Sequence, residues 1–265
     1  TARKTLGRAS RSRYGEAVGG SQQGSVKERL KSTWYGALKR GGLDAVAAHA
    51  SRLVPGRHQT WLRKLVPQPG SYTRDEVRVV ERRGAAWKLV PHDYFQWHQY
   101  FGFEDEVYEL LARVARSAKV VFDIGANIGF YSVTMAREMG PLGRLFSFEP
   151  HPSTFARLQV HLALNEVSNV EARASAVGAE PGRATLRVHA REDSGKASLR
   201  QAFDAQSGVE VDVVTVDEVV AQSGVETVDL MKVDVEGFEP EVLLGAMDTL
   251  QRFAPVLCLE YTPSW

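Results

Sequence analysis

Apolar and polar positions follow a regular order along residues 119–260, where short apolar runs are separated by longer segments of helical spacing. Such runs are typical of strands buried on both faces, and the segments between them are typical of helices that cover a sheet. The predicted strands are 119–124, 144–149, 170–177, 228–234 and 255–260. The predicted helices are 129–139, 152–164 and 239–250. This order predicts an α/β fold with a doubly wound, Rossmann-like sheet, interrupted by hairpin strands near 184–189 and 209–214.

The N-terminal part of the chain has a different pattern. Apolar residues recur every four positions and predict an amphipathic helix from residue 25; they are Val26, Leu30, Trp34 and Leu38. Further on, the pattern predicts a second helix, a proline-containing linker, a hairpin that turns near Arg83 and Gly84, and a third helix; their ranges are 43–53, 67–74, 76–90 and 106–118. We therefore expect a basic, partly disordered extension (1–73), a hairpin and helix cap (74–118) and a main α/β domain (119–265).

Aromatic residues are concentrated in residues 92–103, just before the main domain. Aromatic side chains at this density are typical of a core, which is the interpretation we prefer. The alternative is that some of these rings wall a pocket, with His98 as a base.

Charge divides the chain unevenly. Residues 1–75 hold 15 Lys and Arg against 4 Asp and Glu, although the formal net charge of the whole chain is only +1. A solvated tail explains the basic segment, and contact with nucleic acid or an anionic membrane is the alternative. The sequence contains neither a membrane-spanning apolar stretch nor the apolar run of a signal peptide. Since Cys258 is the single cysteine, we expect a reducing, cytoplasmic setting.

Residues 121–132 read as a strand, a glycine-containing turn and the start of a helix, with Asp123 at the end of the strand. A dinucleotide site requires Gly-x-Gly-x-x-Gly, but aligned on Gly125 this chain has Asn127 and Phe130 at the second and third glycine positions. S-adenosylmethionine carries no phosphate and has a cationic sulfonium and a cationic amino group. An acid followed by a glycine turn, which ends at Gly129, therefore favours S-adenosylmethionine over NAD.

A second acid supports a nucleoside site. Glu149, followed by Pro150, ends the next predicted strand about 20 residues after Gly129, where a carboxylate would accept hydrogen bonds from both ribose hydroxyls. This position alone fits NAD as well. We expect the adenine near the end of the third strand, beside Ser175 and Ala176. The predicted cofactor-binding residues are Asp123, Gly125, Ala126, Asn127, Gly129, Glu149, Pro150, Ser175 and Ala176.

Four segments resemble those of the FkbM-type S-adenosylmethionine-dependent methyltransferases: Asp123 to Gly129, Phe148-Glu149-Pro150, Leu230 to Gly237 followed by Glu239, and Pro255 to Glu260. The block that ends at Gly237 is the most family-specific. The resemblance covers roughly residues 74–260 and implies methyl transfer to an oxygen, here expected to be a hydroxyl of a glycan or natural product. No Asn-Pro-Pro-type motif follows residues 230–237, so a nucleic-acid acceptor is not expected. The family's sheet usually has two more strands after the fifth, which predicts a C-terminally incomplete domain. A non-catalytic binding or interaction module and an NAD-dependent oxidoreductase are the competing interpretations.

The predicted catalytic residues are Lys232, Asp234 and Glu236. Alternation along an extended segment sends the three side chains to one side, at the carboxyl end of a strand, where ligands bind in such sheets. We interpret Asp234 as a base or metal ligand, Glu236 as its partner and Lys232 as the cation that tunes them. The alternative is a structural ion-pair network. Two acids alone are a weak metal signal, and the metal stays unassigned.

Overall fold

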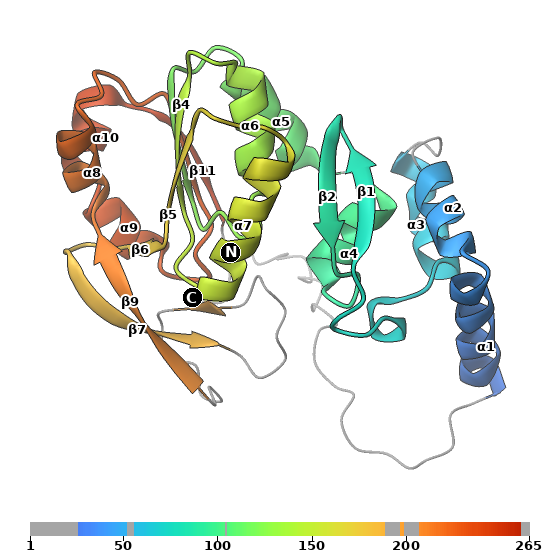
Figure 1. Cartoon of the computed structure of the whole chain (residues 1–265). Coiled ribbons are helices and arrows are strands. Elements are labelled where there is room, and N and C mark those ends of the chain that lie inside the picture. The colour runs from blue at the N-terminus through green and yellow to red at the C-terminus, as the bar shows by residue number, and fades with distance from the viewer. Residues whose placement is uncertain (1–25, 52–55, 104, 189–196, 199–206, 261–265) are drawn as a thin grey trace, which may run out of the picture.

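The computed structural model describes residues 26–51, 56–103, 105–188, 197–198 and 207–260 (Figure 1). Its centre is a sheet of five parallel strands in the order β11-β10-β3-β4-β5. The strands are β3 (Val120–Ile124), β4 (Arg144–Phe148), β5 (Val170–Arg173), β10 (Leu230–Val233) and β11 (Val256–Leu259). Strand β3 lies between β4 and β10. The connection that follows β3 leads to β4 on one side, whereas the connection that follows β10 leads to β11 on the other side, so a crevice is expected at the carboxyl ends of β3 and β10.

Helices cover both faces of this sheet, as Figure 1 shows. One face carries α5 (Glu106–Ala115), α6 (Phe130–Met139) and α7 (Pro152–Leu164). The other carries α8 (Val216–Ser223), α9 (Glu239–Leu244) and α10 (Met247–Phe253). Fully buried rings of Phe122, Phe146 and Phe148 line the second face. The predicted α/β fold with a doubly wound arrangement is confirmed.

Two helical regions in this part of the chain differ from the prediction. The predicted helix 239–250 is divided into α9 and α10 at Gly245 and Ala246. A Cβ at Gly245 would lie 2.0 Å from the carbonyl oxygen of Gly178, so this approach requires glycine for a reason that lies far away in the sequence. Helix α8 was not predicted, although Thr215 caps it by accepting a hydrogen bond from the amide of Glu218.

The predicted strand 170–177 is wrong as a single element. Strand β5 ends at Arg173, which is paired with the last residue of β4, and β6 (Ser175–Val177) then enters a second sheet. That sheet has the order β6-β9-β7-β8, with the predicted antiparallel pairing between β7 (Gly182–Val188) and β9 (Ser207–Val214), and with β8 at Ala197–Ser198. The strand breaks because β4 offers no further ladder partner, whereas Asp212 of β9 pairs with Ser175.

The N-terminal elements form a separate layer beside the sheet (Figure 1). Helices α1 (Val26–Arg40) and α2 (Leu43–Ala50) match the predicted pair. Helix α3 (Gly56–Leu65) was not predicted, and the hairpin of β1 (Arg78–Arg82) and β2 (Ala85–Leu89) turns at Arg83 and Gly84 as expected. Helix α4 (Tyr94–Phe101) follows.

The predicted linker 67–74 is packed into this layer. Tyr72, next to the short 3-10 turn Pro69–Ser71, is only 3% exposed, and the indole nitrogen of Trp97 donates to the carbonyl oxygen of Pro67 at 2.7 Å. Burial of Tyr72 and the hydrogen bond from Trp97 therefore fix residues 67–72 within this layer, although the sequence predicted a linker here.

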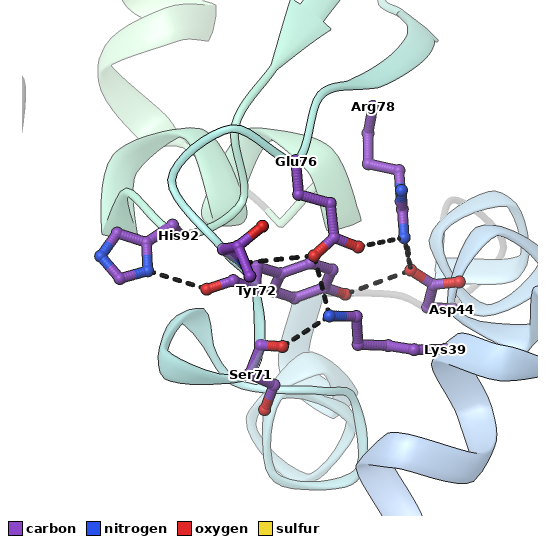
Figure 2. A network of polar contacts seen from close by, with 8 residues as sticks. Lys39, Asp44, Ser71, Tyr72, Glu76, Arg78 and His92 are labelled. Carbon is purple, nitrogen blue, oxygen red and sulfur yellow. Dashed lines mark hydrogen bonds and ion pairs between the residues drawn. The ribbon is translucent and has the colours of Figure 1, made fainter.

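A closed ionic network joins this segment to α1, α2 and β1 (Figure 2). The ammonium of Lys39 lies 2.8 Å from Glu76, and the guanidinium of Arg78 lies 2.6 Å from Glu76 and 3.3 Å from Asp44. The hydroxyl of Tyr72 donates to Asp44, whose side chain is 2% exposed. Two cations balance two carboxylates here, and we refer to Lys39, Asp44, Tyr72, Glu76 and Arg78 as the N-terminal network.

Most of the aromatic segment 92–103 is core, as preferred from the sequence, although Tyr94 is 56% exposed. Trp97, Tyr100, Phe101 and Phe103 are at most 2% exposed, and they pack against Trp87 of β2 and Phe130 of α6 in one cluster. The ring of His98 lies 5.3 Å from that of Phe103. Burial, reinforced by the positive charge of Arg63, lowers the pKa of His98 to about 4. His98 is therefore a neutral core residue at physiological pH.

Among the helices in the described parts of the chain, none is both long enough and apolar enough to cross a lipid bilayer.

Candidate functional site

The loop after β3 is bound tightly to its neighbours. The amides of Gly125 and Ala126 both donate to the carbonyl oxygen of Phe148, at 3.0 and 2.9 Å. Gly125 and Gly129 have φ angles of 77° and 87°, a left-handed conformation that favours glycine. A Cβ at Gly125 would lie 1.8 Å from the carbonyl oxygen of Asp234. The glycines in the sequence pattern are thus required for the close approach of the loop to β4 and to the residue after β10.

Asp123 lies beneath this loop with its side chain fully buried. Its Oδ2 accepts a 2.5 Å hydrogen bond from Ser132, whose hydroxyl oxygen accepts another from Ser147 at 2.9 Å. Its Oδ1 lies 3.3 Å from the ammonium of Lys232. These contacts anchor the loop to α6 and β10, and a direct contact of Asp123 with a cofactor stays a prediction.

Lys232 is the cation at the centre of the site. Its ammonium donates to the carbonyl oxygen of Gly125 at 2.8 Å, lies 3.4 Å from Asp234, and stands 5.3 Å from the ring centre of Tyr131. Burial would lower the pKa of Lys232, but Asp234 and Asp123 outweigh it and the pKa is raised. Lys232 therefore stays charged and holds the loop, rather than serving as a proton acceptor.

Tyr131 and Asp105 form the wall above Lys232. The hydroxyl of Tyr131 donates to Oδ2 of Asp105 at 2.9 Å, while Oδ1 of Asp105 caps α5 by accepting from the amide of Tyr108. Sequence reasoning missed both residues as site members. The only available signal was the position of Tyr131 at the start of the helix that follows the loop.

Three carboxylates converge at the carboxyl ends of β10 and β11, those of Asp234, Glu236 and Glu260. Each offers one oxygen, and these oxygens all lie within 4.8 Å of one another. The convergence of Asp234 and Glu236 was predicted, but its cause is different: Glu236 has a φ of 53°, so the chain turns instead of continuing as a strand. The turn is held by Glu239, which accepts from the amides of Val235 and Gly237. Three carboxylate oxygens suit a hard cation, and no ion is assigned.

Glu260 was not predicted as a site residue. Its amide donates to the carbonyl oxygen of Val233 at 2.9 Å, which brings its side chain beside Asp234. Burial and then the neighbouring Asp234 raise the pKa of Glu260 to about 8. The pKa of Asp234 is lowered: burial opposes this, and Lys232 and a hydrogen bond from Glu260 outweigh it. Near neutral pH Asp234 is thus ionised and Glu260 carries the shared proton.

Glu149 is the predicted ribose-binding acid and ends β4. It is 7% exposed, and its two oxygens accept from the amides of Asn127 and His151 at 3.0 and 2.9 Å. Burial raises the pKa of Glu149 to about 7, although the two amides work against this. Each carboxylate oxygen can accept a second hydrogen bond, so the group fits a ligand that brings two hydroxyl donors. Pro150 follows it, and half-buried Asn127 faces it from the loop.

Ser175 and Ala176 begin β6 and are both buried. The hydroxyl of Ser175 has no hydrogen-bond partner among the residues that the structure describes. The end of β5 lies beside Glu149, because the amide of Glu149 donates to the carbonyl oxygen of Arg173. A buried hydroxyl without a partner in this position fits a polar group of a nucleoside.

The site as a whole fits S-adenosylmethionine. Acids outnumber the single buried ammonium at the carboxyl ends of β3, β10 and β11, which suits a cationic ligand. Spare acceptor capacity at Glu149 and the lone hydroxyl of Ser175 suit its nucleoside.

Three curated relatives are partly similar to this chain, each over about half of its length. Methyltransferase 1 of Beauveria bassiana is 30% identical over 146 residues, which are 48% of this chain and 58% of the relative. The 31-O-demethyl-FK506 methyltransferase FkbM of Streptomyces tacrolimicus is 30% identical over 174 residues, with 55% of this chain and 66% of the relative covered. The hexuronic acid methyltransferase AglP of Haloferax volcanii is 29% identical over 157 residues, with coverages of 56% and 58%. The chain thus spans less than two thirds of the length of each relative.

The methyltransferase FkbM domain model matches residues 123–265, from the acid before the glycine turn to the last residue of the sequence. This match covers more than half of the chain and includes most of the predicted site. It confirms the resemblance inferred from the motifs: the protein belongs to the FkbM methyltransferase domain family.

Proposed function

We propose that this protein is an S-adenosylmethionine-dependent methyltransferase that methylates a hydroxyl oxygen of a glycan or natural product. The observation that carries the proposal is the surplus of carboxylates around one buried ammonium, beside a glycine turn at the carboxyl ends of β3 and β10. Such a site attracts a cationic cofactor and also provides a group that can accept a proton.

The cofactor-binding residues are those predicted from the sequence. Glu149 would accept the ribose hydroxyls, Asn127 and the loop glycines would approach the amino-acid end, and Ser175 and Ala176 would lie beside the base. The start of α6 at Gly129 presents the positive end of a helix to the carboxylate of the ligand. Bound S-adenosylmethionine supplies an electrophilic methyl group. We assign cofactor binding to residues 119–265 and a covering role to residues 74–118, with residues 1–73 as an extension.

Asp234 is the group that we assign to proton removal. A hydroxyl is a poor nucleophile until its proton is removed, and an ionised carboxylate oxygen of Asp234 can accept that proton. Lys232 keeps Asp234 ionised at 3.4 Å, and Glu236 and Glu260 orient the acceptor by hydrogen bonding at the same edge. Tyr131 and Asp105 wall the cofactor side.

The names of the relatives support the proposed acceptor class. The names of two of them specify a sugar acid and an oxygen atom, 31-O, of a natural product. At about 30% identity these names support the oxygen acceptor and leave the molecule open. A hydroxyl acceptor agrees with a site that offers carboxylates as hydrogen-bond acceptors.

Calorimetry with S-adenosylhomocysteine tests the proposal. We expect Glu149→Ala to lose about 1.5 to 3 kcal/mol of binding free energy, or roughly tenfold to a hundredfold in affinity. The control is Glu138→Ala, which removes a surface acid paired with Arg116 at the far end of α6. Binding of NADH by the wild-type protein without binding of S-adenosylhomocysteine would overturn the proposal. Methyl transfer from labelled cofactor into glycan and small-molecule extracts then tests catalysis.

A further inference from the structure

The outer edge of strand β2 is covered by side chains of α7 instead of a third strand. Strand β1 pairs with one edge of β2, which leaves the backbone groups of Ala86 and Lys88 on the other edge. Asn165 binds both groups of Ala86: its Oδ1 accepts from the amide at 2.7 Å, and its Nδ2 donates to the carbonyl at 2.9 Å. An uncovered strand edge has unpaired backbone groups, so α7 completes the hairpin.

His161 lies one turn before Asn165 and meets the next outward-facing residue of β2. Its Nε2 lies 3.2 Å from both the amide nitrogen and the carbonyl oxygen of Lys88. Its Nδ1 lies 2.8 Å from the carbonyl oxygen of Ile128, between Asn127 and Gly129 in the cofactor loop. One side chain therefore contacts both the N-terminal hairpin and the loop.

The protonation state of His161 follows from these partners. Its ring is 1% exposed and packs edge-on against Trp87 at 5.1 Å. Burial, with Arg157 adding to it, lowers the pKa of His161 although the carbonyl oxygen of Ile128 acts in the opposite direction. The imidazole is therefore neutral. Because Nδ1 faces a carbonyl, it carries the hydrogen, and Nε2 accepts from the amide of Lys88.

We propose that His161 is a positioning residue that couples the β1–β2 hairpin to the cofactor loop, so that docking of the hairpin and binding of the cofactor strengthen each other. The inference rests on the proposed function, because the loop must bind S-adenosylmethionine. The loop has an unusual backbone conformation at this point: Asn127 has a φ of 51°, and its amide is the one that donates to Glu149. Fixing the adjacent carbonyl of Ile128 holds that amide in its direction.

Two substitutions of His161 separate its two contacts. Asn places an amide N–H where Nδ1 lies and keeps the bond to Ile128, but it is too short to reach Lys88. Gln places its amide where Nε2 lies and keeps the contact with Lys88, but it leaves the buried carbonyl of Ile128 unpaired. Asn165→Ala is the matched control, because it removes a hairpin contact from the same helix and has no bond to the loop.

Calorimetry with S-adenosylhomocysteine and hydrogen exchange of the Lys88 amide test the coupling. We expect His161→Gln to weaken affinity by about tenfold, the effect of one buried hydrogen bond, and both His161→Asn and Asn165→Ala to change it less than about threefold. In the wild-type protein the ligand should slow exchange at Lys88, because coupling between two sites is reciprocal. In His161→Asn the ligand should bind without slowing this exchange.

The outcomes distinguish the two proposals. If the wild-type protein fails to bind S-adenosylhomocysteine, the proposed function fails and the coupling fails with it. If the wild-type protein binds but His161→Gln binds equally well, His161 only packs between elements and the coupling alone is overturned. The same conclusion follows if the ligand slows exchange at Lys88 in His161→Asn as much as in the wild type.

Discussion

The N-terminal network and the site around Lys232 both bring charged side chains together, but their charges are arranged differently. In the N-terminal network Lys39 and Arg78 balance Asp44 and Glu76 in a chain of three ion pairs, Lys39–Glu76, Glu76–Arg78 and Arg78–Asp44 (Figure 2). Around Lys232 one ammonium faces the buried Asp123 and the cluster of Asp234, Glu236 and Glu260. One region is closed and neutral, and the other has unbalanced negative charge.

We propose that this difference separates ions that only hold the fold from ions that act on a ligand. A neutral, fully paired network has nothing to gain from a ligand, so it can only hold elements together. At Glu260 burial raises the pKa and the neighbouring carboxylates raise it further, and a cationic ligand relieves that repulsion. We therefore expect substitutions in the N-terminal network to change mainly the free energy of unfolding. Substitutions around Lys232 should change ligand binding as well.

The largest effect is expected for Lys232→Met. It removes the only cation near Asp123 that the described contacts provide and leaves a fully buried carboxylate unpaired. We expect a loss of about 3 to 5 kcal/mol in the free energy of unfolding, measured by urea denaturation, together with loss of S-adenosylhomocysteine binding. Lys119→Met, at an exposed position before β3, is the control. A loss below about 1 kcal/mol would show that Asp123 is not held as an ion.

The pH dependence of stability is the next largest effect. The pKa of Glu149 is raised by burial from its usual 4.5 to about 7, so the folded state binds this proton more tightly than the unfolded state. Its contribution is fully present below pH 4.5 and is lost as the pH rises through about 7. Relative to Glu149→Gln, the wild type should lose on the order of 3 kcal/mol of unfolding free energy across this window. Parallel pH profiles for the two proteins would contradict the raised pKa.

Asp44→Asn tests the closed network. It leaves Arg78 without its buried partner in α2, and we expect a loss of about 2 kcal/mol in the free energy of unfolding. The affinity for S-adenosylhomocysteine should stay within about twofold, because the N-terminal network has no surplus charge to offer a ligand. Calorimetry on the same sample as the denaturation measures both. A tenfold loss of affinity would mean that the two regions are not separate in function.

The sequence predicted the parts of the fold whose cause is local. Helix 152–164 was placed correctly, because Pro152 suits a first helical position and the apolar spacing continues to Leu164. The break between β5 and β6 was missed, because it depends on where β4 ends and where β9 lies. Helix α8 was missed because its apolar residues continue the preceding strand pattern.

The residues of the site also fall into those that a local motif predicted and those that it did not. The glycine turn, Glu149 and the Lys232 to Glu236 segment were visible because each lies within one short motif. Glu260 and His161 were not, since their roles come from the register of β11 beside β10 and from the packing of α7 on β2. The spacing of the motif also did not indicate that Lys232 is buried, which the structure shows beside Tyr131.

The smallest expected effect is the most specific test of the surplus charge. S-adenosylmethionine carries a sulfonium charge that S-adenosylhomocysteine lacks, so the ratio of their affinities reports the electrostatic potential of the site. With the pKa of Glu260 at about 8, this acid is mostly protonated at neutral pH and ionised above it. We expect Glu260→Gln to reduce the ratio by about twofold to threefold near pH 9, the effect of one solvated charge several ångströms away, and hardly at all near pH 6.5.

Glu76→Gln is the matched control in the N-terminal network and should leave the ratio unchanged at both pH values. An equal reduction at both pH values would show that Glu260 is ionised throughout, and no reduction at either would show that the acids do not act on the cofactor, so that both ionic regions are structural.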